Sequence, residues 1–256
     1  MEENTGTGQT LTVARTTFEI IELLQDHGEL GVTELGDELD MPKSTAHAYL
    51  KTMSKCGYVT KSDGNYRLSF KLLEHGGLLR NRVEIYQAAK SEIDELARGT
   101  GEVANLAVEE RGQRVILYGA EGENAIWDNS PVGDHSYMHW TAMGKAMLSR
   151  FSRSRVEGII DRHGLPEATE NTITDPESLF EELEEIRERG YSIESEEHRN
   201  SISAIGAPIE SAEKGLIGAI AVVGPTHRFS DPDRIEELSE RVLESVNVIS
   251  LRYTHY

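Results

Sequence analysis

The chain has 256 residues, enough for one large or two ordinary domains with their own cores, and a net charge of −19. Its acidic, polar first ten residues lack the basic start and apolar core of a secretory signal, and no apolar run has membrane-spanning length. Cys56 is the only cysteine, which excludes an intrachain disulfide and a thiolate metal cluster. These features predict a cytoplasmic protein without membrane contact.

The acidity is concentrated in the later part of the chain. Residues 81–256 carry 33 acids against 18 bases, whereas residues 11–80 carry ten acids and eight bases. A surface this acidic repels nucleic acid, so any DNA contact belongs to the N-terminal segment. Acidic surfaces with more Arg than Lys also suit concentrated salt, so we expect a halophilic, haloarchaeal-like protein.

Three helices are predicted at the start of the chain. An apolar stripe predicts the first over residues 13–27. Thr33 is the expected N-cap of a short second helix, and Pro42 suits the first turn of a third that ends at Gly57. The buried stripe of the third helix is spaced i, i+3, i+4, i+7 and consists of Ala46, Tyr49, Leu50 and Met53.

A β-hairpin follows these helices. Strands are predicted over residues 58–60 and 66–68, on either side of a turn over residues 62–65. Three helices followed by such a hairpin predict a winged helix-turn-helix over residues 11–72, with Lys61 and Arg67 on the wing.

The distribution of charge within this segment indicates what it binds. Eight acids and no bases lie between Thr16 and Pro42, whereas six bases and one acid lie between Lys43 and Lys71. A helical subdomain with a solvated basic face is the alternative, but it does not explain why the bases begin at the third helix. We therefore expect contacts with the phosphates and base edges of double-stranded DNA. The candidate contacts are Arg15, Lys43, Ser44, Thr45, His47, Lys51, Lys55, Lys61, Asn65 and Arg67.

The rest of the chain predicts an α+β domain with a central antiparallel sheet. Residues 79–98 predict one long helix, within linker helices over residues 73–100, whose apolar stripe packs within the chain or pairs with a second copy. The domain itself is expected over residues 101–256. Its predicted strands cover residues 103–108, 114–118, 202–209 and 216–223, and its helices cover residues 141–151, 176–189 and 232–251.

Five motifs in order along the chain resemble the IclR-type transcriptional regulators. They are Met41-Pro42-Lys43-Ser44-Thr45-Ala46-His47 with Gly57-Tyr58-Val59, His139-Trp140-Thr141-Ala142-Met143-Gly144-Lys145-Ala146, Arg189-Gly190-Tyr191 with Glu196-Glu197-His198, Ala207-Pro208-Ile209, and Val223-Gly224-Pro225. The resemblance implies a winged helix, a linker helix and a GAF-like effector domain. It also implies homodimers, or dimers of dimers. Ala48 departs from the family, which commonly has Arg there, so the operator sequence cannot be taken from relatives.

The same resemblance implies the position of the effector, a sugar-derived or small organic acid. The matching residues are Ala142, Met143, Gly144, Glu194, Ile202 and Ala204. A helix beginning after Thr141 would favour a carboxylate at its N-terminus, although Gly144 alone is also explained by close helix–sheet packing. Relatives often carry Cys where this chain has Ala204, which predicts a more apolar wall.

Two other classes of function are compatible with parts of the sequence. A metal-dependent enzyme could use His135, His139 and His198, but residues four apart on a strand lie roughly 13 Å from each other. GxSxG, HExxH and phosphate-loop motifs are absent from the sequence. A sensor that acts through protein partners is the second alternative. The sequence therefore predicts a metabolite-controlled, DNA-binding transcriptional regulator, with no catalysis, metal or cofactor.

Overall fold

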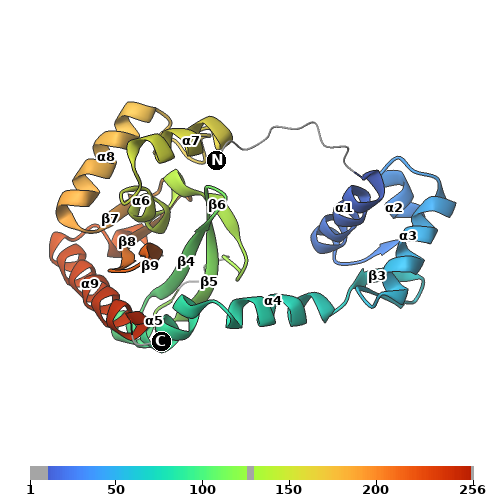
Figure 1. Cartoon of the computed structure of the whole chain (residues 1–256), viewed down its shortest axis with the longest axis horizontal. Helices are drawn as coiled ribbons and strands as arrows, with labels where there is room; N and C mark the ends of the chain where they lie inside the picture. The colour runs from blue at the N-terminus through green and yellow to red at the C-terminus, as the bar shows by residue number, and fades with distance from the viewer. Residues whose placement is uncertain (1–10, 126–129, 255–256) are drawn as a thin grey trace. The chain divides into compact units, whose positions relative to one another are not determined.

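The computed structural model describes residues 11–125 and 130–254 (Figure 1). The chain forms two compact units, with the boundary between Leu79 and Arg80. None of the helices in the described ranges combines the length and apolar character needed to cross a bilayer.

The first unit is a winged helix-turn-helix. Ile20, Leu24, Leu35 and Leu50 are fully buried in its core. The hairpin joins a third, very short strand in the order β1-β3-β2. The elements are α1 (Thr12–His27), β1 (Leu30–Gly31), α2 (Val32–Glu38), α3 (Lys43–Lys55), β2 (Val59–Ser62) and β3 (Asn65–Leu68).

Two details of the first unit differ from the prediction. The second helix begins at Val32 and is capped at Gly31, not at Thr33, because the Glu34 carboxylate accepts a hydrogen bond from the Gly31 N–H at 2.8 Å. Strand β1 was not predicted, since two residues are too few for an alternating pattern. The third helix begins directly after Pro42.

The hairpin turn explains the register of the wing. Asp63 and Gly64 form a two-residue loop and both have positive φ, 50° and 95°. This is the conformation of a type I′ turn, which matches the twist of the two strands and favours Asp-Gly.

The prediction of a single helix over residues 79–98 is wrong. The structure has α4 (Lys71–Asn81) and α5 (Glu84–Thr100), because Val83 has an extended backbone that interrupts the helix. Ile85, Ala89 and Ile93 of α5 are buried in the second unit, so this stripe belongs to the intrachain core. Helix α4 buries none of its residues, and Leu79 is 70% exposed.

The second unit is built on a six-stranded antiparallel sheet in the order β6-β5-β4-β9-β8-β7. Strand β6 and strand β7 were not predicted separately, because each is only three or four residues long. The strands are β4 (Val103–Glu110), β5 (Gln113–Glu121), β6 (His135–Tyr137), β7 (Ser192–Ser195), β8 (Ile202–Ser211) and β9 (Gly215–Pro225).

Helices cover both faces of this sheet, as Figure 1 shows. Helices α5 and α9 (Pro232–Thr254) pack on one face. The other face carries α6 (Ala142–Leu148), α7 (Arg153–His163), which was not predicted, and α8 (Pro176–Arg189). Along β9, Ile220 and Val222 point into the core beneath α5 and α9. The alternating residues Ala219, Ala221 and Val223 point into the core beneath α6 and α8. The smaller residues leave room beneath α6, and the architecture is the expected α+β domain.

Candidate functional site

The exposed face of α3 carries half of the candidate DNA contacts. Lys43, Ser44, His47, Lys51 and Lys55 are all exposed, while Ala46, Leu50 and Met53 hold the opposite face in the core. The helix is therefore anchored by its apolar stripe and presents a polar, basic face to solvent. Such a face fits the phosphate-lined major groove.

The wing adds a second basic element. Arg67 and Lys61 are exposed on neighbouring strands, and the Lys61 ammonium lies 5.3 Å from the centre of the Tyr66 ring. Lys71 has a different role, because its ammonium donates to the Cys56 carbonyl at 2.8 Å and so satisfies the C-terminal end of α3.

Three of the candidate DNA contacts lie in other environments. Arg15 is exposed on α1 and forms an ion pair with Glu19 at 3.3 Å. The Asn65 amide donates to Glu29 at 3.2 Å. Thr45 faces an apolar groove instead of sharing the stripe of Ser44 and Lys51. Contact with DNA stays a prediction for all ten candidate residues.

That groove lies within the first unit and has a volume of about 660 Å³. Residues of α1 and α3 form its walls, and Leu72 of α4 lies at its edge. Two of its lining residues, Val13 and Phe18, are 68% and 65% exposed, and Leu73, which follows Leu72 in the chain, is 70% exposed. Exposed apolar surface of this extent marks an interaction site.

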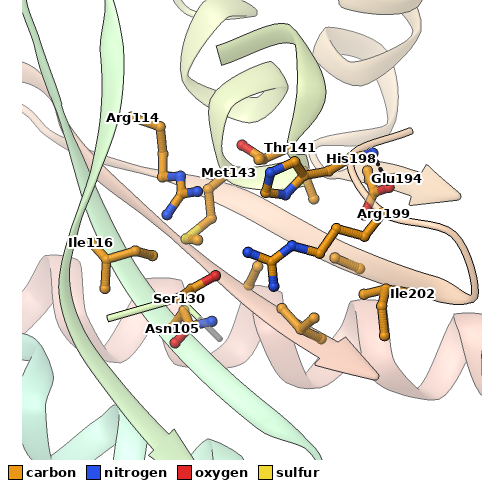
Figure 2. A pocket seen from close by; sticks show the side chains of 14 residues that line it. Asn105, Arg114, Ile116, Ser130, Thr141, Met143, Glu194, His198, Arg199 and Ile202 are labelled. Carbon is orange, nitrogen blue, oxygen red and sulfur yellow. Dashed lines mark hydrogen bonds between the residues drawn. The ribbon is translucent and has the colours of Figure 1, made fainter. Parts of the chain in front are cut away.

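The second unit contains a small pocket between the sheet and α6, with a volume of about 40 Å³ (Figure 2). Five of the six predicted effector residues line it, and Gly144 does not. Its apolar wall comes from small side chains on β8 and β9 together with Met143, Ile116 and Ile202. The five predicted residues are Ala142, Met143, Glu194, Ile202 and Ala204.

Cationic side chains enter this pocket from two sides. Arg114 comes from β5 and Arg199 from the segment after β7, as Figure 2 shows. The Arg114 side chain is 2% exposed, and it is oriented by donation to Ser136 at 2.9 Å and to Asp134 at 3.2 Å. Two guanidinium groups in a mostly apolar cavity match a small carboxylate.

Glu194 is the acid of the pocket and is 3% exposed. Its Oε1 accepts the backbone N–H groups of Glu197 at 2.6 Å and His198 at 3.1 Å. Burial nevertheless raises the pKa of Glu194 to about 7, against these hydrogen bonds and the nearby Lys145 ammonium. The carboxyl group therefore changes charge near neutral pH.

Gly144 has a packing role, which is the alternative that the sequence left open. A Cβ at Gly144 would lie 2.0 Å from the Met138 carbonyl oxygen, so only glycine allows α6 to approach the preceding turn. Thr141 caps the helix by accepting the Gly144 N–H at 3.1 Å, as predicted.

The histidines considered for a metal site have separate neighbours. His135 contacts the Gly133 carbonyl, His139 the Pro166 carbonyl, and His198 stacks on Trp140 with ring centres 5.5 Å apart. Within residues 11–125 and 130–254, no three His, Cys, Asp or Glu side chains are grouped to hold a metal ion.

Six polar lining residues were not predicted as effector contacts: Asn105, Arg114, Ser130, Thr141, His198 and Arg199. Asn105 lies inside the apolar strand β4, and Arg114 is the second residue of β5. The sequence could have indicated these two residues, because a polar side chain within a buried strand needs a specific partner or has a function.

Comparison with known proteins supports both parts of this picture. Residues 13–63 match the family model described as the IclR helix-turn-helix domain, and residues 79–251 match the model described as the bacterial transcriptional regulator IclR C-terminal domain. The probable HTH-type transcriptional regulator ArcR of Halobacterium salinarum is 30% identical over 97% of this chain and 96% of its own length.

Solved structures agree with the fold. The IclR of Thermotoga maritima has a TM-score of 0.81 and 28% identity, covering 94% of this chain and 98% of that one. An IclR homologue from Microbacterium hydrocarbonoxydans, complexed with 4-hydroxybenzoate, has a TM-score of 0.76 and 23% identity and covers 89% and 92% of the two chains. ArcR is named as a transcriptional regulator, which agrees with the predicted class of function. The chain therefore belongs to the IclR family of transcriptional regulators, with a DNA-binding helix-turn-helix domain and a C-terminal ligand-binding domain.

Proposed function

We propose that this regulator binds operator DNA through α3 and the wing, and that a small organic acid in the pocket of the second unit controls this binding. The observation that carries the proposal is the pair of arginines, Arg114 and Arg199, in a cavity with otherwise mostly apolar walls. A carboxylate would accept hydrogen bonds from the two guanidinium groups, and its carbon skeleton would contact the apolar wall.

The size of the cavity limits the ligand. About 40 Å³ holds only a few atoms, so a sugar acid or an aromatic acid requires the flexible side chains of Met143 and Arg199 to move. The IclR homologue from Microbacterium hydrocarbonoxydans shares this fold and was solved in complex with 4-hydroxybenzoate, which supports an organic acid as the effector class.

We also infer that two copies associate through the first unit. Helix α4 buries none of its residues within the chain, and an 11-residue helix with Gly76 and Gly77 in its interior is marginal alone in water. Its exposed Leu73 and Leu78, with the groove beside α1, offer the apolar surface that a second copy would cover. Association would also supply two recognition helices for successive major grooves.

The proposal is tested by two measurements. Fluorescence anisotropy gives the affinity for the DNA upstream of the protein's own gene, and thermal unfolding gives the melting temperature with each probe. Pyruvate, lactate, gluconate and 4-hydroxybenzoate serve as probes, with 4-hydroxybenzamide as the uncharged control. We expect at least one acid to raise the melting temperature and change the DNA affinity, and Arg114→Met to abolish both effects. Arg187→Met, a partly buried arginine outside the pocket, is the matched control.

Failure of every acid to stabilise the protein would refute the ligand class. Absence of DNA binding at low salt would instead favour a sensor that acts through protein partners. Light scattering during the same titrations tests self-association, which a monomer at micromolar concentration would contradict.

A further inference from the structure

Lys145 is a buried cation that does not line the pocket. Its side chain is 1% exposed and lies on α6, two residues after the pocket residue Met143. The ammonium donates to Glu197 at 2.6 Å, to the Ile193 carbonyl at 2.9 Å and to Glu182 at 3.4 Å. One side chain thus joins α6, α8, β7 and the segment after β7.

That segment, residues 196–201, has a conformation that requires external support. Glu196 and Ser201, one at each end, have positive φ values of 59° and 65°, which are unfavourable for residues with a Cβ. Besides Lys145, Thr172 supports the segment by donating to the Glu197 carbonyl at 2.7 Å, and Thr169 by donating to the Glu196 carbonyl at 2.5 Å. The strained backbone is therefore held from several sides.

The supported segment carries the charged wall of the pocket. His198 and Arg199 line the cavity, and the backbone N–H groups of Glu197 and His198 bind the Glu194 carboxylate (Figure 2). We propose that Lys145 is a positioning residue of the effector pocket, whose ammonium holds Glu197 and thereby fixes the place of Glu194, His198 and Arg199. The inference rests on the proposed function, because it assigns these three residues to a ligand.

A buried ion pair often contributes little to the free energy of unfolding, because both charges lose their hydration. The Lys145–Glu197 pair is therefore better explained by its effect on the position of the segment. Replacing a buried pair by neutral side chains of similar volume is often neutral for stability, whereas removing one partner is strongly destabilising. The test variant is therefore the double substitution Lys145→Met with Glu197→Gln. Glu182 keeps a partner in it, because it also pairs with Arg189 at 3.0 Å.

A matched control is available on the opposite face of the sheet. Glu92 of α5 and Arg252 of α9 form an ion pair at 3.2 Å, in which the Glu92 side chain is 11% exposed and the Arg252 side chain is 38% exposed. The control variant is Glu92→Gln with Arg252→Met, which removes an ion pair with one largely buried member from the other face of the sheet.

Two measurements on the full-length protein report on the segment without any ligand. Hydrogen–deuterium exchange follows the amides of residues 194–201. Fluorescence follows Trp140, which stacks on His198 and becomes the sole indole in a Trp127→Phe background. We expect hydrogen exchange of this segment to accelerate about tenfold in the double variant. A tenfold change corresponds to the free energy of about one hydrogen bond. Trp140 emission should rise as the quenching imidazole leaves, and the control variant should change neither signal.

The proposal is overturned if residues 194–201 exchange as in the wild type, or if exchange accelerates equally throughout the second unit. It is also overturned if Trp140 emission is unchanged in a folded variant. The affinity for whichever acid probe binds the wild type should fall about tenfold, in step with the exchange rate. If no probe binds the wild type, the proposed function fails, while exchange still decides whether Lys145 anchors the segment.

Discussion

Replacing Glu194 by Gln should make the protein more stable at alkaline pH, even though the residue lies in a buried polar site. The Glu194 carboxyl has its pKa raised to about 7, chiefly by burial, from the ordinary value of 4.5. Between these two pH values the folded protein holds a proton that the unfolded chain has released. Stability therefore falls as pH rises through this window and levels off above pH 7.

The size of the effect follows from the shift. A difference of one pKa unit corresponds to about 1.4 kcal/mol, so the raised pKa of Glu194 reduces the free energy of unfolding by about 3 kcal/mol at pH 8 relative to pH 4. Glutamine removes this penalty because it is uncharged. Its carbonyl oxygen can still accept the N–H groups of Glu197 and His198, so the local backbone retains its hydrogen bonds.

The assay is urea unfolding of the second unit between pH 4 and pH 8, at constant salt and protein concentration. The free energy of unfolding of Glu194→Gln, relative to the wild type, should increase by about 3 kcal/mol across this range. Glu237→Gln is the control, because ion pairs with Arg234 and Arg241 lower the pKa of Glu237 and keep it charged over most of the range. Parallel curves for wild type and Glu194→Gln would refute the reasoning.

Three further predictions concern DNA, packing and salt. Lys51→Ala should weaken binding to all DNA sequences and reduce the slope of log K against log salt by roughly one. The control Lys90→Ala should leave the slope unchanged, and equal slopes for the two variants would contradict a phosphate contact by Lys51. Gly144→Ala should lower the free energy of unfolding by about 3 kcal/mol because its Cβ meets Met138, while Gly158→Ala, with open space around it, should raise it slightly, as chemical denaturation would show. Raising KCl from dilute to molar concentration should increase the melting temperature, because salt screens repulsion within a chain of net charge −19; a flat salt dependence would contradict halophilic adaptation.

The parts of the fold that could be predicted are those with a periodic pattern and a local cap. Helix α3 followed from its apolar stripe, and α8 from the Asp175 cap, which accepts the Ser178 N–H at 2.9 Å. The break between α4 and α5 was missed because the apolar spacing continues through Val83, where only the backbone conformation changes. Strand β1 is stabilised by pairing with distant Asn65 and Tyr66, which no local pattern records.

The pocket shows the same division. Resemblance pointed to Met143, Glu194 and Ala204, which do line the cavity. Arg114 and Arg199 come from separate strands and loops, so only the three-dimensional fold brings them together. The same holds for Lys145, whose partners Glu182 and Glu197 lie 37 and 52 residues away along the chain.

If occupation of the pocket controls DNA binding, the two sites must be thermodynamically linked, and this linkage can be measured. The dissociation constant for the upstream DNA is measured with and without a saturating acid probe, and the affinity for the same probe is measured with and without DNA. Both constants should change by the same factor, because coupling between two binding sites is reciprocal. A probe that binds in the pocket and leaves the DNA affinity unchanged would contradict this control of DNA binding.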